Sequence, residues 1–333
     1  SVPVRYLAPA GVDDQTLKRI FGKTPAMIAF FEKRYGHPYP WPRYDQVVVH
    51  DFIFGGMENV ASTTLTDLVL TDERAAIDWD AESLIAHELA HQWFGDLLTC
   101  QDWSQGYLNE AWATYSEILW KVEDLGQEEA DYHLYGDLKN YLAECSSRYK
   151  RPIVSYHFRE PIDMFDRHLY EKGALVVHTL RSMLGEDAFW SGVKNYLHDN
   201  AHTTVHTRDF QVALEQSSGR NLDGFFNDWI HRPGHPALTV KTAWTKGLLK
   251  VTVTQRQKGD DVPEAYRFPL TLLVVNKSGE QNVTLPVAER NRTWAIPMDQ
   301  KPLRVEIDHG FRFLSNMTVE GSRELLIASL KND

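Results

Sequence analysis

Apolar residues repeat with two different periods along this chain. Between residues 80 and 235 they recur every three or four positions with few helix breakers, which predicts amphipathic helices. Between residues 236 and 316 they alternate with polar residues or form short β-branched runs between Gly, Asn and Asp, which predicts strands and turns. The predicted helices cover residues 80–97, 109–123, 130–149, 172–184 and 188–200, and the predicted strands cover 237–240, 248–254, 268–275, 282–287 and 303–307.

The change of period near Pro233–Pro236 predicts two domains. We expect a mainly helical α+β domain over residues 1–235, in which a β-branched run at 47–50 contributes to a sheet. We expect a small β-sandwich over residues 236–318. Residues 319–333 return to helical spacing, and we expect them to begin a helical segment or a linker to a further domain.

Composition and charge narrow the classes of function. The chain of 333 residues has 35 Lys and Arg against 46 Asp and Glu, a net charge of −11, which argues against a nucleic-acid partner. No apolar run approaches the roughly 18 residues of a membrane helix, so we expect no membrane partner. The two cysteines, Cys100 and Cys145, cannot build a disulfide framework and fit a reducing compartment such as the cytoplasm, although they do not decide the compartment.

The sequence HELAH at residues 87–91 is the strongest chemical signal. His87 and His91 are four residues apart, so on a helix they share one face and can both reach one ion, for which zinc is suited. Glu88 lies beside the first of them and can take a proton from a water that the metal activates. The alternative from the residues alone is a helix that carries two histidines on a polar face.

Glu110 is the candidate third ligand. It lies in LNEAWATYSE, a predicted second helix, with 18 residues between it and His91. Two histidines and one glutamate leave a coordination position open, which is the catalytic rather than the structural pattern of zinc sites. Taken alone, Glu110 would be interpreted as a solvated helical carboxylate; its spacing from HELAH favours a ligand.

Three more motifs accompany this one. GGMEN occupies residues 55–59, FDRHLYEKG residues 165–173 and DWIHRPGHP residues 228–236. With HELAHQWFGD at 87–96 and the Asn-Glu pair at 109–110, they resemble motifs of the gluzincin aminopeptidases, the family of aminopeptidase N and leukotriene A4 hydrolase. The resemblance covers residues 1–320. It implies a thermolysin-like zinc peptidase domain followed by a β-sandwich, with one zinc ion per chain held by His87, His91 and Glu110.

The resemblance also implies roles in catalysis. Glu88 would be the general base and later the acid toward the leaving amine. Tyr170, which alone would be interpreted as a packed aromatic residue, would donate a hydrogen bond to the oxyanion that forms after attack. Asp166 would orient its neighbours or help to bind the amine. Asn109 is a candidate for a residue that supports the metal ligands.

GGMEN would form the substrate-binding segment. By resemblance, Glu58 would bind the free α-ammonium of a peptide, which is the feature that makes an exopeptidase. Gly55 and Gly56 would let the extended substrate backbone approach closely. Met57 would line the first side-chain pocket, and Asn59 would complete the motif. The expected substrates are therefore peptides with a free N-terminus.

Some positions differ from the family pattern. GxMEN usually continues with WGL, where this chain has VAS at 60–62; HQWFG is usually followed by Asn, where this chain has Asp96; and the segment before the third ligand reads DWSQGY at 102–107. These differences bear on the substrate pocket. A zinc endopeptidase and a non-catalytic interaction scaffold with this fold remain the alternatives. The family also leads us to expect a β-rich domain before residue 1 and a helical domain after the sandwich.

Overall fold

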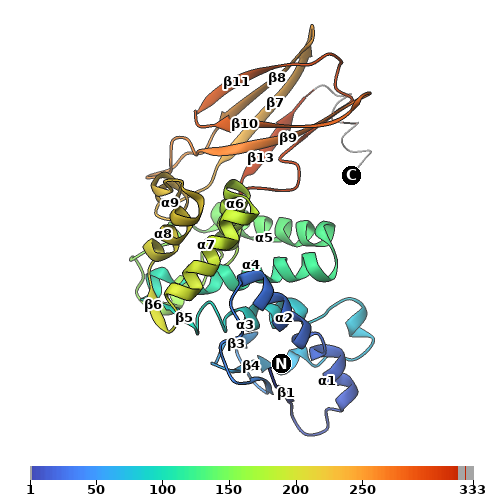
Figure 1. Ribbon diagram of the computed structural model, residues 1–333, viewed down its shortest axis with the longest axis vertical. Helices are drawn as coiled ribbons and strands as arrows, with labels where there is room; N and C mark the ends of the chain where they lie inside the picture. The colour runs from blue at the N-terminus through green and yellow to red at the C-terminus, as the bar shows by residue number, and fades with distance from the viewer. Residues whose placement is uncertain (1, 322–326, 328–333) are drawn as a thin grey trace. The chain divides into compact units, whose positions relative to one another are not determined.

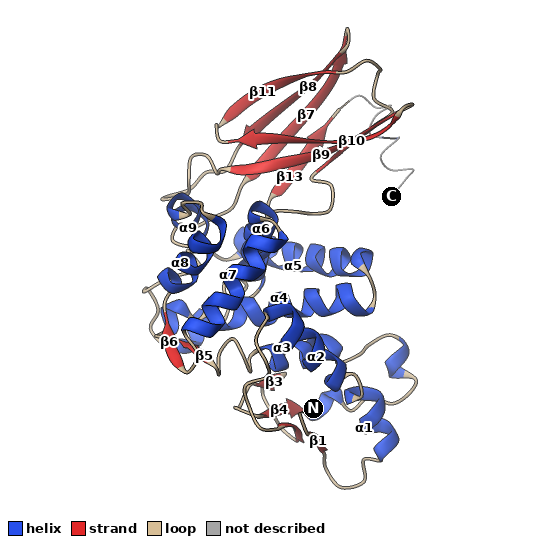
Figure 2. Ribbon diagram, viewed as in Figure 1, coloured by secondary structure: helices blue, strands red, loops and turns tan. Residues whose placement is uncertain are grey.

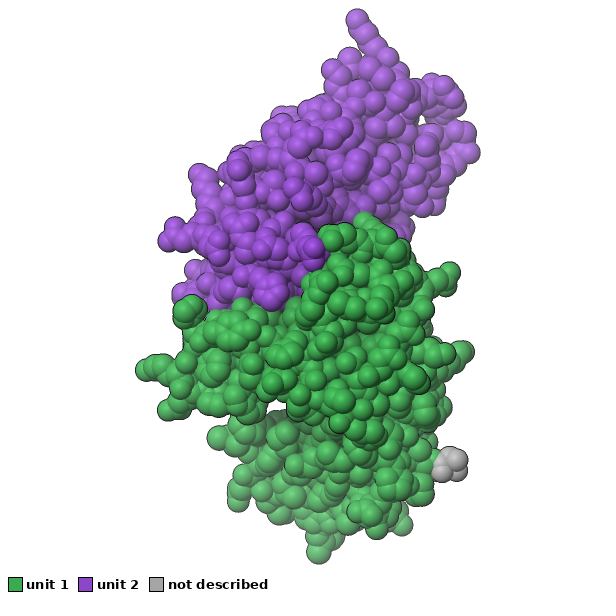
Figure 3. Space-filling view, turned by 60° about the vertical axis from the view of Figure 1, so that its left-hand side comes forward, with its two compact units in different colours: residues 1–140, 154–177, 184–222 green, residues 141–153, 178–183, 223–333 purple. Residues whose placement is uncertain are grey.

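The computed structural model describes residues 2–321 and 327. Its internal contacts divide the chain into two units, residues 1–140, 154–177 and 184–222 in the first and residues 141–153, 178–183 and 223–333 in the second (Figure 3). Helices and strands are both abundant (Figure 2). The predicted α+β class is therefore confirmed, while the domain boundary near residue 236 stays a prediction.

The first unit contains a four-stranded sheet (Figure 1). Its strands, in spatial order, are β1 (Val4–Leu7), β2 (Tyr44–Val49), β4 (Ser62–Thr66) and β3 (Gly56–Met57). The pairs β1–β2 and β2–β4 are parallel, whereas β3 is antiparallel to β4 and has only two residues in register, Gly56 with Leu65 and Met57 with Thr64. The middle of GGMEN, Gly56 and Met57, therefore forms the edge strand of this sheet.

Helices make up most of the rest of this unit. They are α1 (Asp14–Phe21), α2 (Thr24–Tyr35), α3 (Glu82–Ala90), α4 (Tyr107–Asp124), α7 (Glu186–Asp199) and α8 (Thr207–Ser218), together with the parts of α5 (Gln127–Ser147) and α6 (Glu171–Leu184) that belong to it. A short parallel pair joins β5 (Leu98–Cys100) to β6 (Thr203–Val205).

Helix α3 is shorter than the sequence predicts. It was expected to run to residue 97, but it ends at Ala90, with His91 as its C-cap. The chain then turns through Gly95, whose φ of 136° is open to glycine and strained for other residues. The amide of Asp96 bonds back to the carbonyl of His91, at 3.0 Å. His91 keeps a helical backbone (φ −57°, ψ −24°), so the shared face of His87 and His91 survives the early end.

Aromatic packing fixes this turn against α4. The ring of Phe94 stacks on Trp112 of α4, with centroids 4.3 Å apart and planes 5° apart. Both side chains are fully buried. Helix α6 packs closely on the same helix, because a Cβ added at Gly173 would lie 2.5 Å from the Cβ of Ala111. The elements that carry HELAH, Asn109-Glu110 and YEKG thus meet around α4.

The second unit contains two sheets, whose strands are antiparallel except for the parallel pair β7–β13, and helix α9 (Asp223–Trp229). One sheet has the order β11 (Asn291–Pro297), β8 (Leu248–Gln255), β7 (Ala237–Thr245), β13 (Asn316–Glu320), and the other β10 (Gly279–Val287), β9 (Phe268–Asn276), β12 (Arg304–Ile307). The helix predicted from residue 319 is wrong at 319 and 320, which belong to β13; apart from 321 and 327, the rest of it lies outside the described residues. Among the described residues, no helix is long and apolar enough to cross a membrane.

Candidate active site

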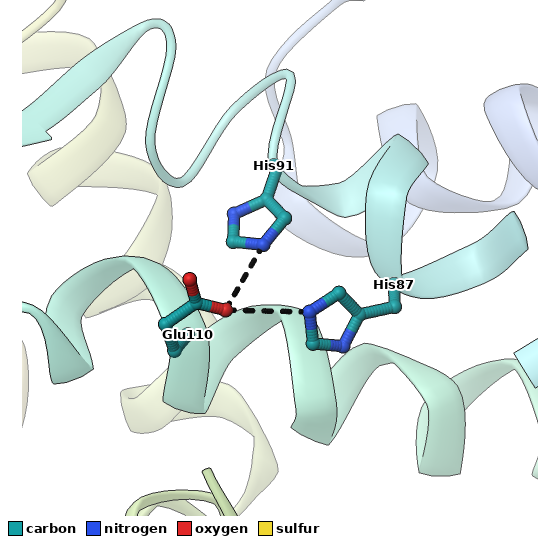
Figure 4. A group of neighbouring side chains, drawn as sticks. All are labelled: His87, His91 and Glu110. Atoms are coloured by element: carbon teal, nitrogen blue, oxygen red, sulfur yellow. Dashed lines mark hydrogen bonds and ion pairs between the residues drawn. The ribbon is translucent and has the colours of Figure 1, made fainter. Parts of the chain in front are cut away.

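His87, His91 and Glu110 meet at one point of the first unit. The Oε2 atom of Glu110 lies 3.3 Å from Nε2 of His87 and 3.2 Å from Nε2 of His91. One ligand atom from each residue lies within 4.8 Å of the other two. Figure 4 shows both imidazole rings turned toward the carboxylate of Glu110. His87 belongs to α3, His91 is the residue that caps this helix, and Glu110 belongs to α4.

The outward nitrogens of both histidines have hydrogen-bond partners. Nδ1 of His87 lies 2.9 Å from Oε1 of Glu117, and Nδ1 of His91 lies 2.9 Å from the carbonyl oxygen of Phe94. Both partners are acceptors, so each Nδ1 can donate its proton to its partner. This arrangement turns Nε2 of each ring toward the common point, which is the orientation of histidine ligands in metal sites.

The donor set and the local charge both fit a divalent cation. Two imidazole nitrogens and one carboxylate are the protein ligands of a catalytic zinc site. Burial by itself would raise the pKa of Glu110, but His91 and His87 lower it to about 2, so the carboxylate stays ionised. Burial would lower the pKa of His91, yet Glu58 and Glu110 raise it to about 9. The surrounding carboxylates therefore favour positive charge at this point.

Glu88 lies beside the three residues but is not one of them. It is 4% exposed, and its Oε2 has no hydrogen-bond partner among the described residues. Burial is the main cause that raises the pKa of Glu88 to about 7, against the lowering effect of His87 and His91. A carboxylate with this pKa can both accept and return a proton near neutral pH.

The glycines of GGMEN lie against α3. A Cβ added at Gly56 would be 2.6 Å from Cγ of Glu88 and closer still to its carboxylate, and a Cβ at Gly55 would be 3.2 Å from Leu84. The sequence led us to expect that these glycines make room for substrate. At Gly56 the space that glycine leaves is taken by Glu88 itself, so this glycine also serves the proton-transfer group.

A cleft of about 860 Å³ opens over the site. Its lining includes all three candidate ligands, Glu88, and Gly55 to Glu58. Five of the lining side chains are carboxylates, and none of the described residues that line it is a lysine or arginine. The apolar part of the lining consists of Phe54, Met57, Leu84, Trp103, Ile162, Met164, Phe165 and Leu169. The cleft thus combines negative charge at its metal site with apolar walls.

Tyr170 lines this cleft at the start of α6. Its ring centroid is 6.1 Å from that of His87. Burial, followed by Glu110 and Glu58, raises the pKa of its phenol, so the hydroxyl stays protonated and can donate a hydrogen bond. Asp166 is buried and accepts hydrogen bonds from the amides of His168 and Leu169 at 2.9 and 3.1 Å. Asp166 thereby orders the turn that presents Tyr170, and it is not among the residues that line the cleft.

The two asparagines take different places. Asn109 lines the cleft, and its Oδ1 accepts a hydrogen bond from the amide of Cys100 at 3.1 Å, which ties α4 to β5. Asn59 is exposed and does not line the cleft; its Oδ1 accepts a hydrogen bond from Oγ1 of Thr64 at 2.9 Å. This contact of Asn59 therefore joins the turn after β3 to strand β4.

Sequence reasoning missed two side chains beside the site. Glu117 bonds to His87, and it lies seven residues after Glu110. Two helical turns return to the same face of α4, so the spacing was a usable signal. Gln92 follows His91 directly and is fully buried. Nothing in its sequence position alone indicates what it contacts.

Comparison with known proteins agrees with this geometry. The sequence profile of the Peptidase family M1 domain matches residues 20–229. The chain belongs to peptidase family M1. It is 29% identical to "Probable aminopeptidase 1" of Sulfurisphaera tokodaii, over 85% of this chain and 35% of that protein. It is 31% identical to "Alanine/arginine aminopeptidase" of Saccharomyces cerevisiae, over 90% of this chain and 36% of that protein.

A solved structure shares the fold. The crystal structure of Legionella pneumophila aminopeptidase A in complex with aspartic acid matches with a TM-score of 0.77 and 18% identity, over 98% of this chain and 38% of that one. This chain therefore spans about a third of the length of the relatives that it matches. Family M1 depends on zinc, and the donor set of His87, His91 and Glu110 fits that metal.

Proposed function

We propose that the protein is a zinc aminopeptidase, which releases N-terminal residues from peptides. One observation carries the proposal. A single cleft is lined by the His87, His91 and Glu110 cluster, by Glu88 and by Glu58. It thus combines groups that can hold a metal, move a proton and bind an amine. The aminopeptidase names of the relatives support the same activity.

His87, His91 and Glu110 would hold one zinc ion per chain. When bound, zinc supplies Lewis-acid chemistry, which makes a water acidic near neutral pH and polarises a carbonyl group. Glu88 would accept the proton of the attacking water and return it to the leaving amine. Its pKa of about 7, which burial raises, suits both transfers.

Glu58 would bind the substrate through its α-ammonium group. A charge-assisted pair with a carboxylate is strong in a partly buried cleft. The other carboxylates of the lining, and the lack of Lys and Arg among its described residues, support a cationic rather than an anionic N-terminus. Tyr170, kept protonated, would donate a hydrogen bond to the oxyanion of the substrate carbonyl.

Zinc content and substrate capping test this function. The purified protein should hold close to one zinc per chain by elemental analysis and cleave fluorogenic aminoacyl amides. Glu88→Gln keeps every ligand, so zinc should remain while kcat falls by about 10²–10⁴. Efficient cleavage of N-acetylated peptides would instead favour an endopeptidase. Zinc binding without turnover on any peptide would favour a scaffold.

We also propose that domains beyond this chain complete the cleft. The matched relatives are about three times as long as the segment that aligns with this chain, which supports flanking domains. A longer form of the protein should then show a higher kcat/KM on the same substrates. Equal values in the two forms would contradict this part of the proposal.

A further inference from the structure

The side chain of Gln92 joins the end of the metal-site helix to the turn that carries Glu58. Its Oε1 accepts a hydrogen bond from the amide of Ala61 at 2.8 Å, and its Nε2 donates one to the carbonyl oxygen of Glu58 at 3.4 Å. These two backbone groups define the orientation of the side-chain amide of Gln92, because the N–H of Ala61 needs an acceptor and the carbonyl of Glu58 needs a donor. The hydroxyl of Tyr39 also donates to Oε1, at 3.3 Å, and to the carbonyl oxygen of Arg43, at 3.2 Å.

The turn between β3 and β4 is also held by backbone hydrogen bonds from the amide of Ser62 to the carbonyl of Asn59, at 2.8 Å, and from the amide of Asp45 to the carbonyl of Ala61, at 2.9 Å; neither of these bonds involves Glu58. Strand β3 is two residues long, and so short a pairing is marginal by itself. Ala61 has a φ of 60°, which is unfavourable for a residue with a Cβ. A strained turn on a short edge strand keeps one geometry only when its surroundings impose it. Gln92, buried and bonded to both ends of the turn, adds a constraint that acts on Glu58 itself.

Gln92 is also covalently next to His91. A hydrogen bond from its side chain to the backbone carbonyl of Glu58 therefore links the residue after a candidate metal ligand to the backbone that carries the proposed amine-binding carboxylate. In an aminopeptidase this connection would affect which peptide bond is cleaved. The ammonium nitrogen and the carbonyl carbon under attack are separated by one Cα, so the distance from Glu58 to the metal decides where the peptide is cut.

We propose that Gln92 is a positioning residue that sets this distance and so restricts cleavage to the first peptide bond after an α-amine. The inference rests on the proposed aminopeptidase function. It predicts that loss of the hydrogen bonds made by the side-chain amide of Gln92 weakens the preference for an amine at the α-position. A role in stability alone would lower activity on all substrates by the same factor.

The test uses two substrates that differ only in the position of the amine. One is an L-alanyl fluorogenic amide, and the other is the β-alanyl amide, whose amine is one carbon, about 1.5 Å, further from the carbonyl. The measured quantity is kcat/KM for the L-alanyl amide divided by kcat/KM for the β-alanyl amide. Zinc content and thermal unfolding are measured on the same preparations.

Three variants separate the contributions. Gln92→Leu removes both bonds to the turn; Gln92→Glu keeps an acceptor for the amide of Ala61 but loses the donor to Glu58. Tyr39→Phe is the matched control, since it removes a bond to the same Oε1 and leaves both turn bonds in place. We expect the ratio to fall at least tenfold in Gln92→Leu and less in Gln92→Glu, chiefly through KM for the L-alanyl substrate. Zinc content should stay at the wild-type value in all three variants. In Tyr39→Phe the ratio should also stay at the wild-type value.

Two outcomes would overturn the inference, and they are distinguishable. If wild type prefers the α-amine and both Gln92 variants keep that preference while losing overall rate, Gln92 contributes stability only. If Gln92→Leu does not fold, the same comparison is made with Gln92→Glu alone. If wild type cleaves neither free-amine substrate although it holds zinc, the proposed function fails, and the positioning role with it.

Discussion

Gly56→Ala is expected to remove activity without removing the metal. The backbone of Gly56 does not require glycine, because its φ is not positive. The new Cβ would lie 2.6 Å from Cγ of Glu88, whereas carbon atoms in contact are about 3.5–4.0 Å apart. Glu88 or the edge strand must therefore move by about 1 Å. The three atoms nearest to the new Cβ all belong to Glu88 and none to a candidate ligand.

The size of the effect follows from what Glu88 does. A misplacement of about 1 Å in a reacting group can cost about 10²-fold in rate, and general base catalysis contributes about 10²–10⁴ in total. We expect kcat to fall about 100-fold, with KM within a few-fold of wild type. Steady-state kinetics on an aminoacyl amide, elemental analysis for zinc and thermal unfolding would be measured together.

Gly55→Ala is the matched control. Its Cβ would meet only Leu84, at 3.2 Å, a contact that a small shift of the side chain relieves. It should keep most of the wild-type kcat, and any loss should appear as a higher KM, because Gly55 lines the cleft where the substrate backbone would lie. The double variant Gly56→Ala/Glu88→Gln should be no slower than Glu88→Gln, because both changes disable one group. A Gly56→Ala enzyme with kcat within threefold of wild type, or an equal loss in Gly55→Ala, would refute the reasoning.

Three further changes test the surroundings of the site. Ala61→Gly should raise the melting temperature by about 1–2 °C without loss of activity, since it relieves a positive φ; a lower melting temperature would count against strain. Glu117→Gln should weaken zinc affinity about 10–100-fold in a chelator competition, because it removes the charged partner of His87. Burial, with Glu117 and Glu171 adding to it, raises the pKa of Asp137 to about 8, so the folded protein holds a proton that the unfolded chain releases above about pH 4. Stability should therefore fall as pH rises from about 4 to 8, and Asp137→Asn should make the melting temperature decline less between pH 5 and 8.

The sequence was most informative where the chemistry is local. HELAH places two histidines on one helical face whatever surrounds the helix, and the apolar period located α4 to within two residues at its N-terminal end. The period was less reliable for the end of α3, because Trp93, Phe94 and Leu97 are apolar and buried but belong to a tight turn. Gly95 was the available signal for that end. A buried turn and a buried helix give the same hydrophobic pattern.

Contacts between distant segments were out of reach of pattern reasoning. The short helices α1 and α2 and the strands β11 and β13 were not predicted, since they are short or pair with strands far along the chain. The placement of Glu88 against Gly56 depends on the packing of α3 against β3, which no periodicity encodes. The same holds for Gln92. Motif resemblance found the site residues, but the contacts that make them work together became visible only in three dimensions.

The role inferred for Gln92 explains why the segment after GGMEN can depart from the family pattern. The two groups that Gln92 binds are the carbonyl of residue 58 and the amide of residue 61, and both belong to the backbone. Most side chains at residues 60–62 leave these groups in place, and only a proline at 61 would remove the donor. Val60 is exposed, and its side chain does not line the cleft. We therefore expect Val60→Trp to leave the preference for the α-amine unchanged, whereas a change at Gln92, far smaller in volume, should alter it. If Val60→Trp relaxed that preference as much as Gln92→Leu, the turn would be positioned by its own side chains, and the backbone bonds to Gln92 would not be what fixes the distance from Glu58 to the metal.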